Sequence, residues 1–210
     1  MKIVGIIAEY NPFHKGHEFH IEKAKKITGA DAAIIIMSGD YVQRGIPSIM
    51  PKHLRTQMAL ACDADVVLEL PVCYATGSAE YFATGAVSLL EALGCVDYLC
   101  FGSECGEIKI LQQIADVLCK EPAHYKVLLQ KHFKNGNTCI PEQISKILDS
   151  PNNILGIEYL KALSCLNSSI EPVTITREGA GYHDQTLGGL FSSASALRQG
   201  LQDCELTKNA

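Results

Sequence analysis

The segment AEYNPFHKGHEFH, residues 8–20, places three histidines, a proline and a glycine directly after an apolar run. The histidines are His14, His17 and His20. Imidazoles in such a cluster can bind a metal ion, lie on the surface of an amphipathic helix, or donate hydrogen bonds to a phosphate. Gly16 has no Cβ, so backbone or ligand can approach closely between the first two histidines.

The surroundings of this segment favour phosphate binding over the other two chemistries. No cysteine or carboxylate triad accompanies the histidines, so we expect no metal site. Surface exposure explains His20 alone but not the HxGH set. A helix that begins here offers N–H groups to an anion, and His14 and His17, three residues apart, can face the same space.

The elements that position this segment follow from hydrophobic periodicity. Continuous apolar runs predict buried parallel strands at 2–8, 31–37, 65–70 and 96–101, with one more at 171–176. Helical patterns occupy 16–28, 52–62, 78–93, 108–120, 123–133, 141–148 and 154–165. Ser78 and Gly94 fit the two caps of the third helix.

This order of elements predicts an α/β fold with a Rossmann-like, doubly wound parallel sheet and right-handed crossovers. Ligands of such sheets bind at the carboxyl ends of the strands, where residues 8–20 begin. We expect residues 1–105 plus 171–210 to form a nucleotide-binding domain. Residues 106–170 are expected to form a helical insertion or cap.

Composition is that of a globular protein, with 47% hydrophobic and 20% charged residues among 210. No apolar run approaches the roughly 20 residues of a membrane span, and no cleavage site follows the first segment. A cytoplasmic location without a membrane partner is therefore expected. The net charge of −5 argues against non-specific nucleic-acid binding by the whole surface.

Two groups of residues receive plain structural interpretations. The nine cysteines form no CxxC pair, so we expect reduced thiols that act as small core residues. Basic residues cluster at 23–26, 52–55 and 126–134, and such clusters are more often solvated helix faces than phosphate tracks.

HxGH is a signature with which nucleotidylyltransferases and class I aminoacyl-tRNA synthetases hold ATP phosphates, and its place between a buried strand and a helix strengthens it. Further stretches add to it across the chain: MSGDYVQRGIPSIMPKHLRTQMAL, DVVLELP, FGSE, SPNNILGIEYL, REGAGYHD and SSASALR. With them the chain resembles the bacterial tRNA(Met) cytidine acetate ligase family, whose fold is of the nucleotidylyltransferase type. Members run to roughly twice this length, so we expect the C-terminal part that helps to grip tRNA to be missing.

The resemblance implies an enzyme that uses ATP and acetate to form acetyl-adenylate. The acetyl group then passes to N4 of the wobble cytidine of elongator tRNA(Met). ATP, acetate and this tRNA are the implied partners, with Mg²⁺ accompanying ATP.

The resemblance also implies site residues. Catalytic roles fall on His14, His17 and Arg177. SSASALR is similar to a mobile phosphate-binding arm of nucleotidylyltransferases. The implied ATP contacts are Ile7, Ala8, Glu9, Tyr10, Asn11, Pro12, Phe13, His14, Lys15, Gly16, His17, His20, Gly102, Asn152, Arg177, Ser192, Ser193 and Arg198.

Several of these residues also have structural explanations. Arg177 and Arg198 could form surface salt bridges. Gly102 could be a turn glycine at a strand end. Asn152 could cap the helix at 154–165, with or without a ligand role.

The sequence does not decide the roles of several other residues near the expected site. Gly39, Gln43, Arg44 and Lys52 follow the second strand on the ligand side, where acetate or RNA could bind. Glu69 and Glu104 could assist through magnesium or serve as caps.

Two other functions are compatible with the sequence. One is an adenylyltransferase acting on a small phosphorylated metabolite. The other is a non-catalytic module that binds a nucleotide or RNA.

Overall fold

The computed structural model describes residues 1–120, 147–176 and 198. Its centre is a sheet in the order β3-β2-β1-β4-β5, in which every neighbouring pair is parallel. The strands are β1 (Ile3–Ala8), β2 (Ala32–Ser38), β3 (Val66–Leu70), β4 (Tyr98–Ser103) and β5 (Glu171–Thr176). The expected doubly wound α/β sheet is confirmed, and the strand order reverses between β1 and β4.

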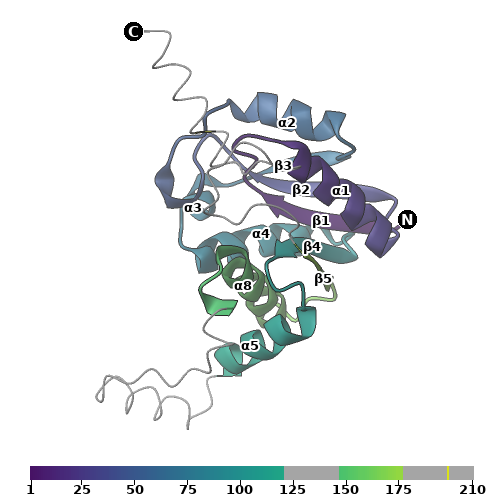
Figure 1. The fold of residues 1–210 in the computed structure, drawn as a ribbon, viewed down its shortest axis with the longest axis vertical. Coiled ribbons are helices and arrows are strands. Elements are labelled where there is room, and N and C mark those ends of the chain that lie inside the picture. Colours follow the sequence, from purple (N-terminus) through teal and green to yellow (C-terminus); the bar gives the residue numbers. More distant parts are fainter. Residues whose placement is uncertain (121–146, 177–197, 199–210) are drawn as a thin grey trace.

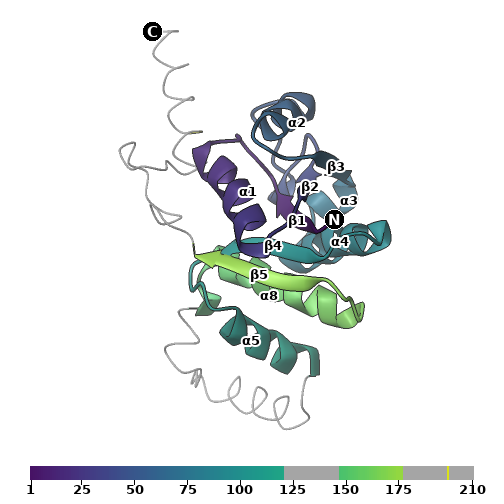
Figure 2. The same cartoon turned by 90° about the vertical axis from the view of Figure 1, so that its right-hand side faces the viewer.

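Helices cover both faces of the sheet (Figures 1 and 2). α1 and α2 pack on one face and α4 and α8 on the other, while α5 packs against α8 and β5. Their bounds are α1 (Lys15–Thr28), η1 (Gln43–Gly45), α2 (Lys52–Ala61), α3 (Val72–Ala75), α4 (Ala79–Leu93), α5 (Ile108–Lys120) and α8 (Pro151–Cys165). The helices expected at 123–133 and over most of 141–148 lie outside the described residues.

β1 is buried on both faces, which explains its uninterrupted apolar sequence. Ile3 and the partly buried Ile7 belong to the core on the α4 side. Val4 and Ile6 belong to the core on the α1 side, and neither exposes any surface. The last residues of β1 therefore sit at the junction of the two cores.

Aspartates at 31, 65 and 97 set where the strands begin. Asp31, Asp65 and Asp97 each accept a backbone N–H from the start of a neighbouring strand, at 2.8, 2.8 and 2.7 Å. Their own backbone N–H groups also bond to the neighbouring chain, so they stand at the margin of the ladder, and β2, β3 and β4 begin one or two residues later than expected. β4 accordingly runs on to Ser103 and includes Gly102, which was expected to end the strand.

The predicted caps of α4 are confirmed: the Ser78 side chain accepts the Tyr81 N–H, and Gly94 adopts a left-handed φ of 63°. α8 differs from its prediction because it begins at Pro151, three residues early. Asn152 therefore lies in the first turn and is not the helix cap.

Glu104 supplies the capping oxygens of α8 instead. Its Oε2 accepts the Asn153 N–H at 2.9 Å, and its Oε1 accepts the Asn152 side-chain amide at 2.6 Å. The Asn153 Oδ1 in turn accepts the Glu104 N–H at 2.9 Å. This reciprocal pairing fixes the start of α8 against the carboxyl end of β4, and a carboxylate there suits the helix dipole.

The basic cluster at 52–55 is not a solvated face throughout, because Arg55 exposes no surface at all. Its guanidinium donates to the carbonyls of Glu9 (2.6 Å), Ser38 (3.1 Å), Met50 (3.1 Å) and Gly39. The planar fork of arginine suits several acceptors at once. One side chain thus joins the carboxyl ends of β1 and β2 to the approach to α2.

Charge around Arg55 is balanced at longer range. Burial lowers the pKa of Arg55, and the negative charges of Asp40, Glu9 and Glu69 act in the opposite direction. Lys52 on the same helix forms an ion pair with Glu69 at 2.7 Å. The ion pair thus joins α2 to the end of β3, and the Arg55 hydrogen bonds join the same helix to the ends of β1 and β2.

The cysteine prediction is only partly correct. All seven described cysteines are free thiols, but only Cys100 is buried, and Cys73, Cys95 and Cys165 are exposed. The other two cysteines lie outside the described residues. None of the helices in the described ranges is both long and apolar enough to cross a bilayer.

We predict that Arg55→Lys lowers the free energy of unfolding by about 2–4 kcal/mol, because the compact ammonium leaves buried carbonyls without a donor. Urea unfolding measures this loss. His53→Ala, at an exposed position of the same helix, is the control and should stay within about 0.5 kcal/mol. Equal stability of Arg55→Lys and the parent would contradict the proposed role of Arg55 in joining the two strand ends.

Candidate active site

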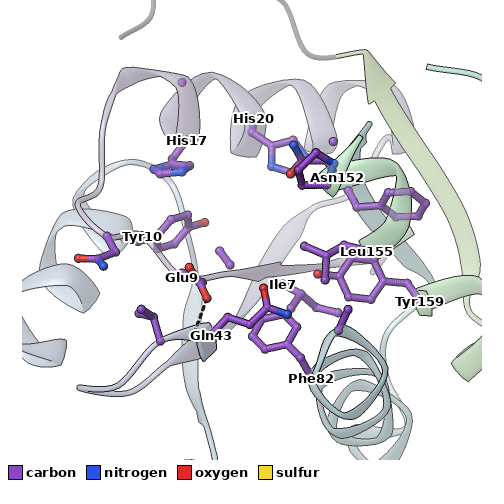
Figure 3. A pocket seen from close by; sticks show the side chains of 18 of the residues that line it. Ile7, Glu9, Tyr10, His17, His20, Gln43, Phe82, Asn152, Leu155 and Tyr159 are labelled. Carbon is purple, nitrogen blue, oxygen red and sulfur yellow. Dashed lines mark hydrogen bonds between the residues drawn. The ribbon is translucent and has the colours of Figure 1, made fainter. Parts of the chain in front are cut away.

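A cavity of about 660 Å³ opens at the carboxyl ends of β1 and β4, where the strand order reverses (Figure 3). This is the place at which doubly wound sheets bind ligands, and the volume is typical of a small-molecule site. Its lining comes from the loop after β1, the start of α1, η1, the start of α4, the end of β4, the start of α8 and Arg198.

The loop between β1 and α1 is held from both sides. The Asn11 Oδ1 accepts the Ile49 N–H at 2.9 Å, and the Asn11 carbonyl accepts from Arg198 Nη1 at 2.6 Å. Glu9 receives the Gln43 N–H on its Oε1 at 2.8 Å. The peptide bond before Pro12 is cis. These contacts fix the path of the loop above the sheet.

Tyr10 occupies an unusual backbone conformation inside this loop. Its φ is 50°, a left-handed value that costs a non-glycine residue about 1–3 kcal/mol. Its ring packs against Phe13 and His17 with centroid distances of 4.8 Å each, and only 2% of the residue is exposed. No described residue hydrogen bonds to its hydroxyl, and burial, with a smaller effect of Cys62, raises its pKa.

His14 and His17 form a reciprocal cap at the start of α1. The His14 Nδ1 accepts the Gly16 N–H at 3.1 Å, and the His17 Nδ1 accepts the His14 N–H at 3.3 Å. The two rings stack at 3.7 Å with an interplanar angle of 21°. Because each Nδ1 is an acceptor, each neutral ring carries its proton on Nε2 and presents that atom as a donor.

His20 lies one helical turn further along the same wall. Its Nε2 is 3.8 Å from the Sγ of Cys100, a buried residue in the centre of β4. Burial raises the pKa of the Cys100 thiol to about 12, so the sulfur stays protonated. His20 therefore contacts both the cavity and the sheet, and its setting differs from that of the two capping histidines.

A second wall of the cavity was foreseen only in part. It consists of Ile7, Gln43, Phe82, Leu155 and Tyr159, and we call it the Gln43–Tyr159 wall. Ile7 was expected as an ATP contact, and Gln43 was placed on the ligand side by its position after β2. The other three follow the apolar pattern of their helices, which gives no sign that they line a cavity and not a closed core.

The sequence-predicted contacts divide into three groups. Those that line the cavity are Ile7, Ala8, Glu9, Tyr10, Asn11, His14, Gly16, His17, His20, Gly102, Asn152 and Arg198. Pro12, Phe13 and Lys15 do not line it: the first two are buried and the third is exposed. Arg177, Ser192 and Ser193 lie outside the described residues, as does the side chain of Arg44.

The carboxylates suggested for magnesium have other partners. Glu69 pairs with Lys52, and Glu104 caps α8. Among residues 1–120, 147–176 and 198, no group of three potential ligands lies close enough to hold a metal ion.

The chain is similar to curated proteins along nearly its whole length. A tRNA(Met) cytidine acetate ligase of Clostridium botulinum (strain Okra / Type B1) is 49% identical over 97% of this chain and 54% of the relative. The protein of that name from Acetivibrio thermocellus is 49% identical over 95% of this chain and 51% of the relative. The chain thus spans about half the length of these relatives.

Solved structures agree with these similarities. Thermotoga maritima TmcAL in its apo form superposes with a TM-score of 0.90 at 38% identity, covering 97% of this chain and 52% of that one. The same protein bound with alpha-thio ATP gives 0.85 at 37% identity, covering 98% and 51%. A HIGH Nucleotidyl Transferase family model matches residues 1–210, and the chain belongs to this family.

Proposed function

We propose that this chain activates acetate with ATP. We propose further that the acetyl group then passes to N4 of the wobble cytidine of elongator tRNA(Met), a transfer carried out by proteins of the relatives' full length. The observation that carries the proposal is the pair of capping histidines, which line the cavity and whose rings are held at Nδ1 by backbone N–H groups. Relatives of 49% identity that are named tRNA(Met) cytidine acetate ligases support it.

The first step is an in-line displacement at phosphorus. An acetate oxygen attacks the α-phosphorus of ATP, the bond from that phosphorus to the bridging oxygen breaks, and pyrophosphate leaves with the electron pair. The product is acetyl-adenylate. Negative charge grows on the leaving group and on the equatorial oxygens, so the protein's contribution is positioning and hydrogen-bond donation, with no protein nucleophile.

His14 and His17 are suited to that contribution. In our proposal their Nε2–H groups donate to phosphate oxygens, and the start of α1 adds its dipole. Both rings are held by backbone N–H groups, so their orientation is set before ATP binds. Preorganised donors of this kind are the main electrostatic aid to such a transition state.

Cations at the carboxyl side of the sheet complete the phosphate site in this proposal. Arg198 donates to the Asn11 carbonyl and lines the same cavity as the histidines. Together with Ser192 and Ser193 it forms the phosphate-binding arm that the sequence suggests, and Arg177 is a further cation with a catalytic role. The resemblance of SSASALR to the arm of nucleotidylyltransferases, and of REGAGYHD to the acetate ligase family, supports these last assignments.

In our proposal the nucleoside end of ATP lies at β4 and α8. Gly102 and Asn152 line this end of the cavity, and Glu104 orients the Asn152 amide. The proposed division into a nucleotide-binding domain, 1–105 plus 171–210, and a helical cap, 106–170, then has a functional meaning. α8, which falls in the cap, supplies Asn152, Leu155 and Tyr159 to the cavity.

The second step consumes the adenylate. The N4 amine of the cytidine attacks the acetyl carbonyl, the bond from carbon to the AMP oxygen breaks, and N4 loses a proton. AMP and N4-acetylcytidine are the products. A tRNA substrate fits a cytoplasmic location, and the chain's net charge of −5 implies that RNA is held by a local surface and not by the overall charge.

We predict acetate-dependent exchange of labelled pyrophosphate into ATP by the 210-residue chain. Exchange should require both acetate and ATP, because only the formation of acetyl-adenylate is reversible in this way. Exchange that ignores acetate but responds to a phosphorylated metabolite would instead indicate a small-molecule adenylyltransferase. ATP binding with no exchange would indicate a non-catalytic nucleotide-binding module.

The transfer step has its own prediction. Elongator tRNA(Met) incubated with ATP, labelled acetate and a full-length relative should carry N4-acetylcytidine at the wobble position, detected by mass analysis of its nucleosides. The same incubation with the 210-residue chain measures how much of the transfer this part performs. Acetyl-adenylate formation without labelled tRNA from either protein would contradict the proposed acceptor.

We predict that His14→Asn and His17→Asn each reduce exchange about 10²–10³-fold and leave the melting temperature nearly unchanged. The asparagine Oδ1 takes the place of Nδ1 and still accepts the capping N–H, while the distal donor is lost. His53→Asn, on the exposed face of α2, is the matched control. Full exchange activity in both cavity variants would show that the two imidazoles serve only as helix caps.

A further inference from the structure

The Gln43–Tyr159 wall lies on the opposite side of the β1 end from the capping histidines. Figure 3 shows His17 and His20 on one side of the cavity, with Gln43 and Phe82 on the other. The Ile7 side chain packs with the core of α4 and α8, whereas Ala8 packs with the α1 core. The wall is therefore a separate surface next to the place where the phosphates are proposed to bind.

Two polar groups on this wall have no partner within the described residues. Tyr159 is only 4% exposed, and no described residue hydrogen bonds to its hydroxyl, which points into the cavity (Figure 3). The side-chain amide of Gln43 is likewise unpaired within the described part of the chain, although its backbone N–H is held by Glu9. Because Tyr159 lines the cavity, a molecule bound there can accept the hydrogen bond of its hydroxyl.

The remaining surface of the wall is apolar and close to a helix start. Phe82 is 3% exposed and Ile7 and Leu155 are half-buried. Ser78 and Ala79, at the start of the 15-residue helix α4, also line the cavity. A small molecule with an anionic end and an apolar end matches this combination, because the helix start favours a negative charge.

Charges near the wall act in both directions. Glu9 is an anion next to Gln43 and disfavours a second anion. The buried guanidinium of Arg55 donates to the Glu9 carbonyl at 2.6 Å and offsets that charge. Burial, and secondarily Glu9, raises the pKa of Tyr159, so its hydroxyl remains a donor at neutral pH.

We propose that the Gln43–Tyr159 wall binds the short-chain carboxylic acid that ATP activates, an inference that rests on the function proposed above. The Tyr159 hydroxyl and the Gln43 amide donate to the carboxylate and aim one oxygen at the α-phosphorus. Phe82, Leu155 and Ile7 surround the methyl group and limit the length of the acid. The bond changes are those of the displacement described above, with pyrophosphate as the leaving group.

Tyr159→Phe tests the hydroxyl, with Tyr81→Phe as the matched control because Tyr81 is 63% exposed on α4. The measurement is pyrophosphate exchange against acetate and ATP concentration. We expect the KM for acetate to rise at least tenfold in Tyr159→Phe, with the KM for ATP changed less than twofold. A structural role alone would change both constants together with the melting temperature.

Leu155→Ala tests the limit on chain length, and Leu166→Ala at the exposed end of α8 is its control. The kcat/KM for propionate relative to acetate should rise at least tenfold in Leu155→Ala only, because the lost side chain makes room for one more carbon.

Two results distinguish failure of this inference from failure of the proposed function. Acetate-dependent exchange in the parent, with an unchanged acetate KM in Tyr159→Phe and unchanged acid preference in Leu155→Ala, would overturn the acid site alone. Absence of acetate-dependent exchange in the parent would overturn the proposed function and, with it, the acid site.

Discussion

The buried guanidinium of Arg55 is the interaction on which the geometry of the cavity depends. It binds the carbonyls that end β1 and β2, and these two strands carry the loops that hold Asn11 and Gln43. A cation enclosed by carbonyl oxygens is costly to bury and costly to remove, because each acceptor would lose its donor. The strand ends from which the histidine loop starts are therefore held in position by Arg55. The same contacts stabilise the left-handed backbone of Tyr10 in that loop.

The capping box at the start of α1 links local structure to chemistry. The same Nδ1 atoms that satisfy helix N–H groups leave the distal nitrogen of each ring as a donor. Folding of the helix start thus selects the tautomer that an anionic ligand needs. On the other side of β1, Tyr159 and Gln43 provide donors of a different kind, so the end of one strand separates two surfaces with two proposed tasks.

The sequence allowed the sheet and the location of the site to be predicted, because buried parallel strands are continuously apolar and HxGH follows the first of them. The strands begin one or two residues later than expected, at the margin where the side chains of Asp97 and its counterparts accept a neighbouring backbone N–H; apolar patterning does not reveal such contacts. Burial of Arg55 was missed because a basic residue on a helix ordinarily faces solvent. Tyr159 and Phe82 were missed because a residue that lines a cavity and one that fills a core have the same helical spacing.

The protonation pattern of His14 and His17 most directly tests whether this loop is a preorganised phosphate site. Long-range proton–nitrogen correlation NMR of the imidazoles, with and without an ATP analogue, reports which nitrogen carries the proton and which one meets the ligand. We expect the Nε2–H tautomer for both rings in the ligand-free protein, with the largest shifts at Nε2 when the analogue binds. Nδ1–H tautomers, or shifts confined to other residues, would contradict the proposal that this loop is a preorganised phosphate site.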